Sequence, residues 1–349
     1  MNQPRQIGFG IVGTGAIAGL HAAAIRDTDG AVLRAVCNRS PEKGRAFAGN
    51  HRCEAMPDLD ALLARTDIDA VCVATPTGSH RDVALAAFAA GKHVLCEKPL
   101  ETDLTRIDAM TEAARNSGLI LAAIFQGRFG DGARRLKEAV EQGRFGQLAL
   151  CSARVPWWRS QQYYDEAPWR GSWRLDGGGA LMNQAIHTAD LLQWMAGMPA
   201  EVAAYSANVA HQRIEAEDTL VAALRFPHGA LGVFECATSA FPGMPRRIEI
   251  SGDRGSAVLV NDEIAWWSFA EPRPGDEDPG KNASESPPEG GASDPRAIKS
   301  LGHRLQVADL VEAIRQRRAP AIPGEEGRRA VQLVRAIYES AVSGRPVLL

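Results

Sequence analysis

The sequence lacks closely spaced cysteines. Its six cysteines are scattered, and no two of them form a Cys-x-x-Cys pair (Cys37, Cys53, Cys72, Cys96, Cys151 and Cys236). Three lie inside apolar, strand-like runs, where a free thiol behaves as a small hydrophobic group. The histidines and cysteines together show no metal-ligand spacing. We therefore expect neither a disulfide framework nor a metal site.

Long apolar runs and an excess of positive charge are also absent. The longest apolar stretches, such as 83–90, are far shorter than the roughly 20 residues that a membrane-spanning helix needs. The residues after Met1 do not form the apolar core of a signal peptide, so we expect a cytoplasmic protein with no membrane partner. The formal net charge of −3 argues against a broad basic surface for nucleic acid.

Residues 1–125 alternate between short apolar runs and helix-like segments. The apolar runs are Ile7–Val12, Val32–Cys37, Ala70–Ala74, His93–Cys96 and Leu119–Phe125. This pattern predicts an α/β domain, with a parallel sheet covered by helices on both faces. The total length of 349 residues indicates a second domain, because single cores rarely grow beyond about 250–300 residues.

Residues 126–349 have a different pattern, in which strand-like runs follow one another with few helices between them. The runs are Leu148–Val155, Val202–Asn208, Thr219–Phe226, Ala230–Ala237, Arg247–Ser251 and Ser256–Val260. They predict an α+β domain on a mostly antiparallel, open-faced sheet, interrupted by one helix at 180–195. The segment 271–297 is rich in Pro, Gly, Ser and acidic residues and predicts a surface loop. Two amphipathic helices close the chain.

A glycine-rich turn follows the first apolar run. Gly13-Thr14-Gly15-Ala16-Ile17-Ala18 fits the G-x-G-x-x-A pattern between a strand and a helix. Gly13 permits the tight turn, Gly15 lets the backbone approach a pyrophosphate, and Ala18 lets the helix pack closely on the strand. The phosphates would bind at the helix N-terminus, where free N–H groups favour anions. The first domain is therefore expected to be a Rossmann-type NAD(P)-binding domain.

The end of the second apolar run bears on which dinucleotide binds. An acidic residue there would bind the adenine ribose 2′-hydroxyl of NAD, but this chain has Asn38-Arg39-Ser40. Hydrogen-bond donors and a positive charge suit a 2′-phosphate, so NADP is favoured. The alternative is NAD, with Arg39 stacked on adenine and Asn38 on the ribose.

Three further motifs carry a family resemblance. They are Ala74-Thr75-Pro76 with His80, the run Gly91 to Pro99 that ends in Glu97-Lys98-Pro99, and the run Gly177 to His187. Together with the glycine-rich turn, they make the chain resemble the glucose–fructose oxidoreductase / inositol dehydrogenase (Gfo/Idh/MocA) family. The resemblance covers nearly the whole chain. It implies that Thr75, Pro76, His80, Glu97 and Lys98 lie at the cofactor.

By that resemblance, Lys98 reaches both the nicotinamide ribose and a substrate hydroxyl. The residues agree, because Lys98 follows a parallel strand at the end where open α/β sheets bind ligands. A lysine there can hydrogen-bond a developing alkoxide. Pro99 is expected to fix the turn that aims Lys98, and a proline permits a cis bond. A surface lysine near a strand end is the alternative.

His187 resembles the family's general acid/base. Asn183 precedes it by four residues, so both side chains should project from one helix face. A histidine with a pKa near neutrality suits uptake of a hydroxyl proton. Many family members have Asp at position 183, and Asn cannot raise the basicity of His187 by charge. Lys98 is expected to share the proton transfer, and Asp190 either supplies the missing charge or only packs the helix.

Aromatic and arginine side chains gather before the His187 helix, at Trp157-Trp158-Arg159, Tyr163-Tyr164 and Trp169 to Arg174. Flat rings against sugar C–H faces, with arginine on hydroxyl or acidic groups, form a plausible sugar site. We take Arg159, Tyr164, Trp169 and Arg170, with Lys98, Asn183 and His187, as candidate substrate-binding residues. The alternative is that these rings pack the sheet and cap an oligomer interface.

The sequence predicts an NAD(P)-dependent oxidoreductase that transfers hydride to or from a hydroxyl or carbonyl of a sugar, polyol or sugar derivative. Lys98 and His187 handle the proton, and Asn183 orients the substrate. The open sheet face is expected to form a homodimer or homotetramer. The alternatives are a glycosidase that uses NAD for transient oxidation and a non-catalytic dinucleotide-binding sensor of the same fold.

Overall fold

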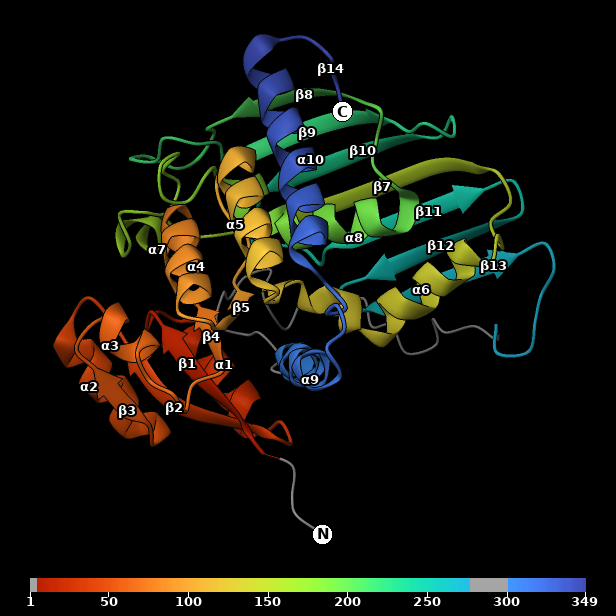
Figure 1. Ribbon diagram of the computed structural model, residues 1–349. Helices are drawn as coiled ribbons and strands as arrows, with labels where there is room; N and C mark the ends of the chain where they lie inside the picture. The colour runs from red at the N-terminus through yellow and green to blue at the C-terminus, as the bar shows by residue number, and fades with distance from the viewer. Residues whose placement is uncertain (1–4, 277–300) are drawn as a thin grey trace. The chain divides into compact units, whose positions relative to one another are not determined.

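The computed structural model describes residues 5–276 and 301–349, which divide into two compact units (Figure 1). The first unit runs to Gln126 and takes in a later segment that ends at Arg328. The second unit runs from Gly127 and includes the C-terminal segment Arg329–Leu349. The division after Gln126 cuts the chain between a parallel sheet and a mostly antiparallel one.

The first unit is built on a six-stranded sheet in the order β3-β2-β1-β4-β5-β6, and all its strand pairs are parallel. The strands are β1 (Ile7–Val12), β2 (Ala31–Cys37), β3 (Glu54–Met56), β4 (Ala70–Val73), β5 (His93–Cys96) and β6 (Leu121–Ala123). The helices between them are α1 (Ala18–Arg26), α2 (Pro41–His51), α3 (Leu59–Leu63), α4 (His80–Ala89) and α5 (Leu104–Ser117). The predicted Rossmann-type parallel sheet is confirmed.

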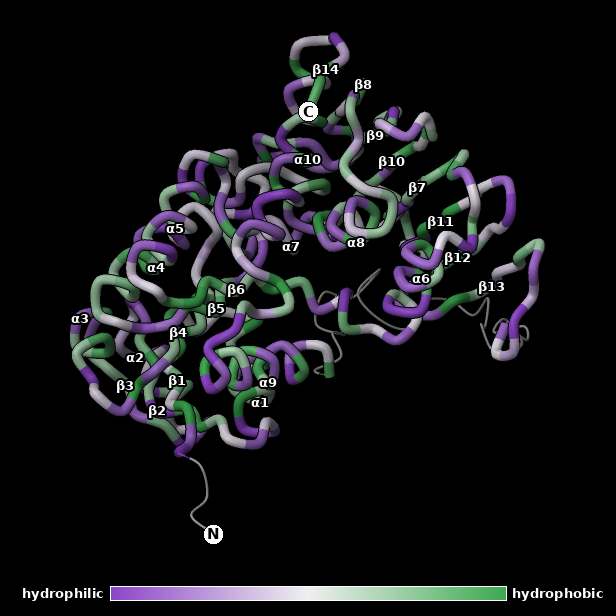
Figure 2. Tube along the Cα trace, turned by 45° about the vertical axis from the view of Figure 1, so that its right-hand side comes forward, coloured by the Kyte–Doolittle hydropathy of each residue, from purple (hydrophilic) through white to green (hydrophobic). Residues whose placement is uncertain are grey.

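Local sequence signals explain where these elements begin and end. The strands β1 and β4 are buried along their whole length, as expected for strands covered on both faces. Figure 2 colours β4 and β5 mainly as hydrophobic, whereas colours alternate along α5. Ser40 caps α2 by accepting from the Lys43 N–H, with Pro41 at the first helical position. Gly118, at φ +67°, ends α5 in the left-handed conformation.

The helix α9 (Leu301–Gln316) corrects the expected domain division of 1–125 and 126–349. It belongs to the first unit, where Val307, Leu310 and Val311 lie in one core cluster with Phe9 and Ile11. Each of these fully buried side chains contributes roughly 1.5–3 kcal/mol relative to an exposed one. The apolar stripe of α9 was visible in the sequence, but the face that it covers was not.

The second unit is built on an eight-stranded sheet in the order β13-β12-β11-β7-β10-β9-β8-β14. The strands are β7 (Leu148–Pro156), β8 (Glu201–Ala207), β9 (Thr219–Arg225), β10 (Leu231–Ala237), β11 (Arg247–Gly252), β12 (Gly255–Val260), β13 (Glu263–Phe269) and β14 (Val347–Leu348). All neighbouring strands are antiparallel except β7 and β10. The prediction of a mostly antiparallel sheet is confirmed.

The helices of the second unit differ from the prediction in three places. They are α6 (Asp131–Glu141), α7 (Gln161–Asp165), the π-helix η3 (Ala180–Ala185), α8 (Ile186–Ala196) and α10 (Gly324–Ser343), which crosses the boundary between the units. The helices α6 and α7 were not predicted, and the single helix expected at 180–195 begins with a π-helical turn. The predicted loop at 271–297 lies outside the described residues from 277 onward.

One face of the second sheet is open, as predicted. Along β9 and β10 buried and exposed residues alternate, with Leu220, Ala222 and Phe234 buried. Neighbouring strands contribute the exposed apolar side chains Leu150, Tyr205, Val221, Leu231 and Val233. Leu231 is paired with Leu150 and Val221 with Tyr205, and Val233 is two residues from Leu231 on the same face of β10. Paired residues in a sheet point to the same face, so these side chains form one apolar surface.

Candidate active site

The glycine-rich turn lies between β1 and α1 in the first unit. Gly13 has φ +98°, and a Cβ there would lie 2.5 Å from the backbone oxygen of Ala74. A Cβ at Gly15 would meet no atom within 4 Å, so the backbone at Gly15 can be approached from outside. Ala18 is fully buried at the start of α1, and no side chain caps this helix. The turn therefore offers backbone donors and a positive dipole end to an anion such as a pyrophosphate.

The end of β2 lies beside this turn. The Asn38 amide donates to the hydroxyl of Thr14, which joins the residues expected to bind the ribose to those expected to bind the phosphates. Arg39 is exposed, and Ser40 is engaged in capping α2. Residues 38–40 contain no carboxylate, so a charge for a 2′-phosphate is available there only from Arg39.

His80 connects two turns at the carboxyl ends of β4 and β5. Its ring nitrogens lie 2.8 Å from the backbone oxygen of Thr75 and 2.9 Å from that of Pro99. The side chain is buried and contacts both turns. The Lys98–Pro99 peptide bond is cis, as the sequence permitted. His80 thus fixes the turn that carries Lys98.

A buried charge cluster lies directly before Lys98. The Glu97 carboxylate lies 2.7 Å from Nε2 of His21 and 3.8 Å from Nε2 of His303, and its other oxygen accepts from the Lys98 N–H at 3.1 Å. Burial opposes the charged form of Glu97, but the hydrogen bond from His21 and the nearby His303 outweigh it and hold the pKa of Glu97 well below its ordinary value. Burial opposes the charged form of His21, but hydrogen bonds to Cys72 and Glu97 outweigh it and raise the pKa of His21 to about 10.

This cluster was not predicted, because its members come from α1, the end of β5 and α9, which lie far apart in the sequence. One nitrogen from each histidine and one Glu97 oxygen all lie within 4.8 Å of one another, a grouping that could hold a metal ion. Ligands of a tetrahedral zinc ion at about 2.0–2.1 Å would stand roughly 3.3 Å apart. The 2.7 Å separation of His21 and Glu97 is instead that of a charged hydrogen bond.

In the second unit, Asn183 lies within a hydrogen-bonded chain of four side chains. Arg159 donates to the Gln184 oxygen at 2.7 Å, Gln184 donates to the Asn183 oxygen at 2.6 Å, and Asn183 donates to Asp176. Asp176 is buried and also accepts from the Gly171 N–H at 2.8 Å. The amide of Asn183 is therefore oriented by a carboxylate on one side and an amide on the other.

Asp176 and Gln184 were missed by the sequence reasoning. Asp190, on the same helix, was the only acid predicted near His187. Asp190 is buried in a two-point ion pair with Arg128, at 2.7 and 2.8 Å. The carboxylate that reaches the Asn183 amide comes instead from Asp176, seven residues earlier and across a run of three glycines.

The aromatic segment divides between the site and the core. Tyr163 accepts from Gln184 at 2.9 Å, and the Arg170 guanidinium lies 4.0 Å from the centre of its ring. Tyr164, which the sequence reasoning chose, is buried and bonded to the Thr238 hydroxyl at 2.7 Å. Trp169 is half-buried beside Arg170. Arg159 and Arg170 thus gather around Tyr163 rather than Tyr164.

Comparison with known proteins assigns both parts of the chain to one family. Residues 7–125 match the model of the oxidoreductase family with an NAD-binding Rossmann fold, and residues 133–258 match the GFO/IDH/MocA C-terminal domain. A myo-inositol 2-dehydrogenase from Thermotoga maritima is 32% identical over 261 residues, which cover 72% of this chain and 75% of the relative. The chain belongs to the Gfo/Idh/MocA oxidoreductase family. The family resemblance drawn from the motifs is therefore confirmed, as is the expected NAD-binding oxidoreductase.

Two further relatives show the range of the family. A 2,7-anhydro-N-acetylneuraminate hydratase from Mediterraneibacter gnavus is 32% identical over 259 residues, which cover 73% of this chain and 67% of the relative. The crystal structure of the WlbA dehydrogenase from Bordetella pertussis, in complex with NADH and UDP-GlcNAcA, has a TM-score of 0.88 at 36% identity. That likeness covers 99% of each chain.

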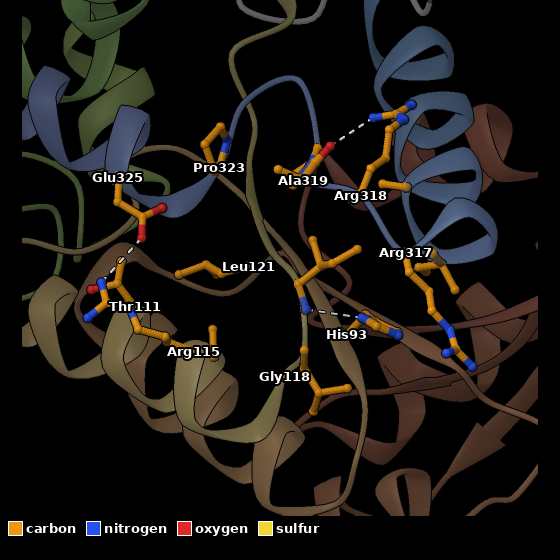
Figure 3. Close-up of a pocket in the computed structure, with 16 residues that line it drawn as sticks. His93, Thr111, Arg115, Gly118, Leu121, Arg317, Arg318, Ala319, Pro323 and Glu325 are labelled. Carbon is orange, nitrogen blue, oxygen red and sulfur yellow. Dashed lines mark hydrogen bonds and ion pairs between the residues drawn. The ribbon is translucent and has the colours of Figure 1, made fainter.

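A cavity of about 560 Å³ lies elsewhere in the first unit (Figure 3). It is lined by the end of α5, the end of α9 and the first residue of β5, His93. Arg115 pairs with Glu325 at its rim, and the His93 ring accepts from the Ile120 N–H. None of the predicted site residues lines this cavity. Lys98 follows the end of β5 opposite to His93.

Among the helices that the structure describes, none is long and apolar enough to cross a membrane.

Proposed function

We propose that this chain catalyses reversible hydride transfer between a nicotinamide dinucleotide and a ring hydroxyl of a nucleotide-linked sugar that carries an acidic group. The observation that carries the proposal is the chain from Arg159 through Gln184 and Asn183 to Asp176, with Arg170 beside it. Guanidinium groups suit a carboxylate or phosphate, and oriented amides suit sugar hydroxyls. The WlbA relative, matched over 99% of its length, is complexed with NADH and UDP-GlcNAcA.

The residues of the glycine-rich turn fit a dinucleotide. Gly13, Thr14, Gly15, Ala16 and Ile17 would hold the pyrophosphate at the uncapped start of α1. When bound, the dinucleotide supplies the acceptor or donor of hydride at the carbinol carbon. Thr75, Pro76 and the Lys98 turn follow the carboxyl ends of β4 and β5, where ligands of such sheets bind.

The chain's own residues handle the proton. Oxidation of a secondary alcohol releases the hydroxyl proton as the hydride leaves. Lys98 hydrogen-bonds the developing alkoxide, and His187 accepts the proton, with Asn183 orienting the sugar hydroxyl. Asp176 accepts a hydrogen bond from the Asn183 amide, so its negative charge lies next to the amide that orients the sugar hydroxyl.

A substrate panel tests the proposal by reduced-nicotinamide absorbance. We expect UDP-GlcNAcA to be oxidised faster than myo-inositol and faster than the same nucleotide sugar without its carboxylate. No reduction with any of these sugars would overturn the proposal. Turnover of a sugar without net change in the dinucleotide would instead favour an elimination or hydration reaction, the chemistry that the name of the M. gnavus relative indicates.

The preference between NADP and NAD is a separate proposal. Arg39, exposed at the end of β2 with no carboxylate beside it in residues 38–40, supports NADP. The NADH in the WlbA complex supports NAD by analogy. We retain NADP as the expectation from the residues, and fluorescence titration with both reduced cofactors tests it. Tighter binding of NADH, unchanged in an Arg39→Ala variant, would contradict that expectation.

We also propose that the open face of the second sheet joins two copies of this chain as a homodimer, or four as a homotetramer. The support is the apolar surface of Leu150, Tyr205, Val221, Leu231 and Val233, each of them 45% or more exposed. Contiguous apolar surface of this kind marks an interaction site. Sedimentation of a Leu231→Lys/Val233→Lys variant should give a smaller species than wild type. A wild-type monomer would contradict the proposal.

A further inference from the structure

The start of the π-helix Ala180–Ala185 is held by a buried carboxyl group from another part of the chain. The first backbone N–H groups of a helix have no partner within it. Here Glu217 accepts from the Gly179 N–H at 3.1 Å and from the Leu181 N–H at 2.8 Å. The backbone oxygen of Glu217 accepts from the Ala180 N–H at 2.9 Å. Glu217 therefore satisfies three successive donors.

Tyr338 on α10 completes the cap. Its hydroxyl accepts from the Gly179 N–H at 3.1 Å and the Met182 N–H at 3.2 Å, and it donates to Glu217 at 2.9 Å. Every backbone donor from residue 179 to residue 182 is thus bonded to Glu217 or Tyr338. Both side chains are buried, with 5% and 4% of their surfaces exposed.

The two glycines before the π-helix are required by this cap. A Cβ at Gly178 would lie 2.2 Å from the Tyr338 hydroxyl, and one at Gly179 would lie 1.8 Å from the backbone oxygen of Glu217. Neither position has room for a side chain unless the cap moves. The glycines of the Gly177 to His187 motif therefore allow the close approach of Glu217 and Tyr338.

We propose that Glu217 and Tyr338 are positioning residues, which fix the turn that presents Asn183 and His187; this inference rests on the function proposed above. The Asn183 N–H donates to the Gly179 oxygen at 3.0 Å. The direction in which Asn183 projects from the helix therefore depends on the position of Gly179, which the cap holds. His187 lies one turn further along. A shift of the cap would displace the amide that orients the substrate and the imidazole that takes the proton. Misplacement by about 1 Å can cost on the order of 100-fold in rate.

The kinetic test compares Glu217→Gln and Tyr338→Phe with Ser340→Ala. Ser340 is buried on the same helix and bonds the Ala204 N–H and the Arg345 oxygen, away from the turn. We expect kcat for the oxidation of UDP-GlcNAcA to fall about 10- to 100-fold in the first two variants. The KM for the dinucleotide, which binds the first unit, should change less than about twofold. Wild-type kcat in a folded Tyr338→Phe protein, or an equal loss in Ser340→Ala, would overturn the proposal.

Amide hydrogen exchange tests the cap independently of the proposed function. Amides in the 177–187 segment should exchange faster in Glu217→Gln and Tyr338→Phe than in wild type and Ser340→Ala. This result does not depend on the substrate. Unchanged amide exchange in both variants would overturn the proposal that Glu217 and Tyr338 hold this turn, even if the wild type oxidises sugars. Absence of sugar oxidation in the wild type would overturn only the proposed function. Faster exchange with unchanged kcat would show that the cap does not position the site.

Discussion

Glu97 in the first unit and Glu217 in the second are buried to the same extent, yet the pKa values of their carboxyl groups are shifted in opposite directions. Each has 5% of its surface exposed. The pKa of Glu97 lies well below the ordinary value, because the hydrogen bond from His21 and the nearby His303 favour its charged form against the effect of burial. Burial raises the pKa of Glu217 to about 7, because its partners are neutral backbone N–H groups and a phenol. The partner, rather than burial alone, decides whether a buried acid stays charged.

Both carboxyl groups hold the backbone of a turn that carries a candidate catalytic side chain. Glu97 accepts from the N–H of Lys98, and Glu217 accepts from Gly179 and Leu181 before Asn183. The first turn is therefore held by a fixed charge and the second by a group that titrates near neutrality. This difference predicts different responses to mutation and to pH.

Removing the charge of Glu97 should have the largest effect on stability. In Glu97→Gln, His21 and His303 lose their anionic partner inside the core. Breaking a buried ion pair on one side costs about 3–5 kcal/mol. We expect the free energy of unfolding, measured in urea, to fall by that amount. Glu112→Gln, an exposed position on α5, is the matched control. A loss below about 1 kcal/mol would show that His21 and Glu97 do not form a charged pair.

The pH dependence of stability should distinguish the two acids. Glu217 has a raised pKa in the folded state, so its contribution is present below the unfolded value of 4.5 and is lost as pH rises through about 7. Over that window wild type should lose on the order of 3 kcal/mol relative to Glu217→Gln. Urea unfolding at several pH values measures this difference. A difference that does not change with pH would contradict the raised pKa.

The two histidines should contribute unequally. His21 lies 2.7 Å from Glu97 and His303 lies 3.8 Å from it. A hydrogen bond to a charged group is worth about 1.5–3 kcal/mol, whereas the longer contact lies outside hydrogen-bond distance. His303→Gln should therefore cost less stability than His21→Gln, by about 1–2 kcal/mol. Equal losses would indicate that both histidines share the charge of Glu97.

The first unit was predictable from the sequence because its signals are local. Apolar runs, the glycine turn at Gly13 and the cap at Ser40 each lie within a few residues of the element that they define. The packing of α9 was not predictable, since its stripe at Val307 gives no information on which core it joins. The helix α6 was missed because its apolar residues are few and are interrupted by charged ones.

The candidate site was predicted in part. The motifs singled out Lys98, Asn183 and His187, but contacts between distant segments decide what surrounds them. Neighbouring residues of a helix point about 100° apart, so only one of Tyr163 and Tyr164 can face the site. The sequence did not indicate which of the two faces it. Asp176, Glu217 and Tyr338 contact the segment before His187 through hydrogen bonds that join parts of the chain separated in the sequence, and no local pattern indicates them.

One variant tests most directly whether Lys98 acts on the proton of a sugar hydroxyl while the glycine turn holds the dinucleotide. Lys98→Met should keep the affinity of wild type for the reduced cofactor, measured by fluorescence, to within a few-fold. Its kcat for sugar oxidation should fall by about 1000-fold or more, because both the charge and the donor are lost. Turnover within tenfold of wild type would contradict the account.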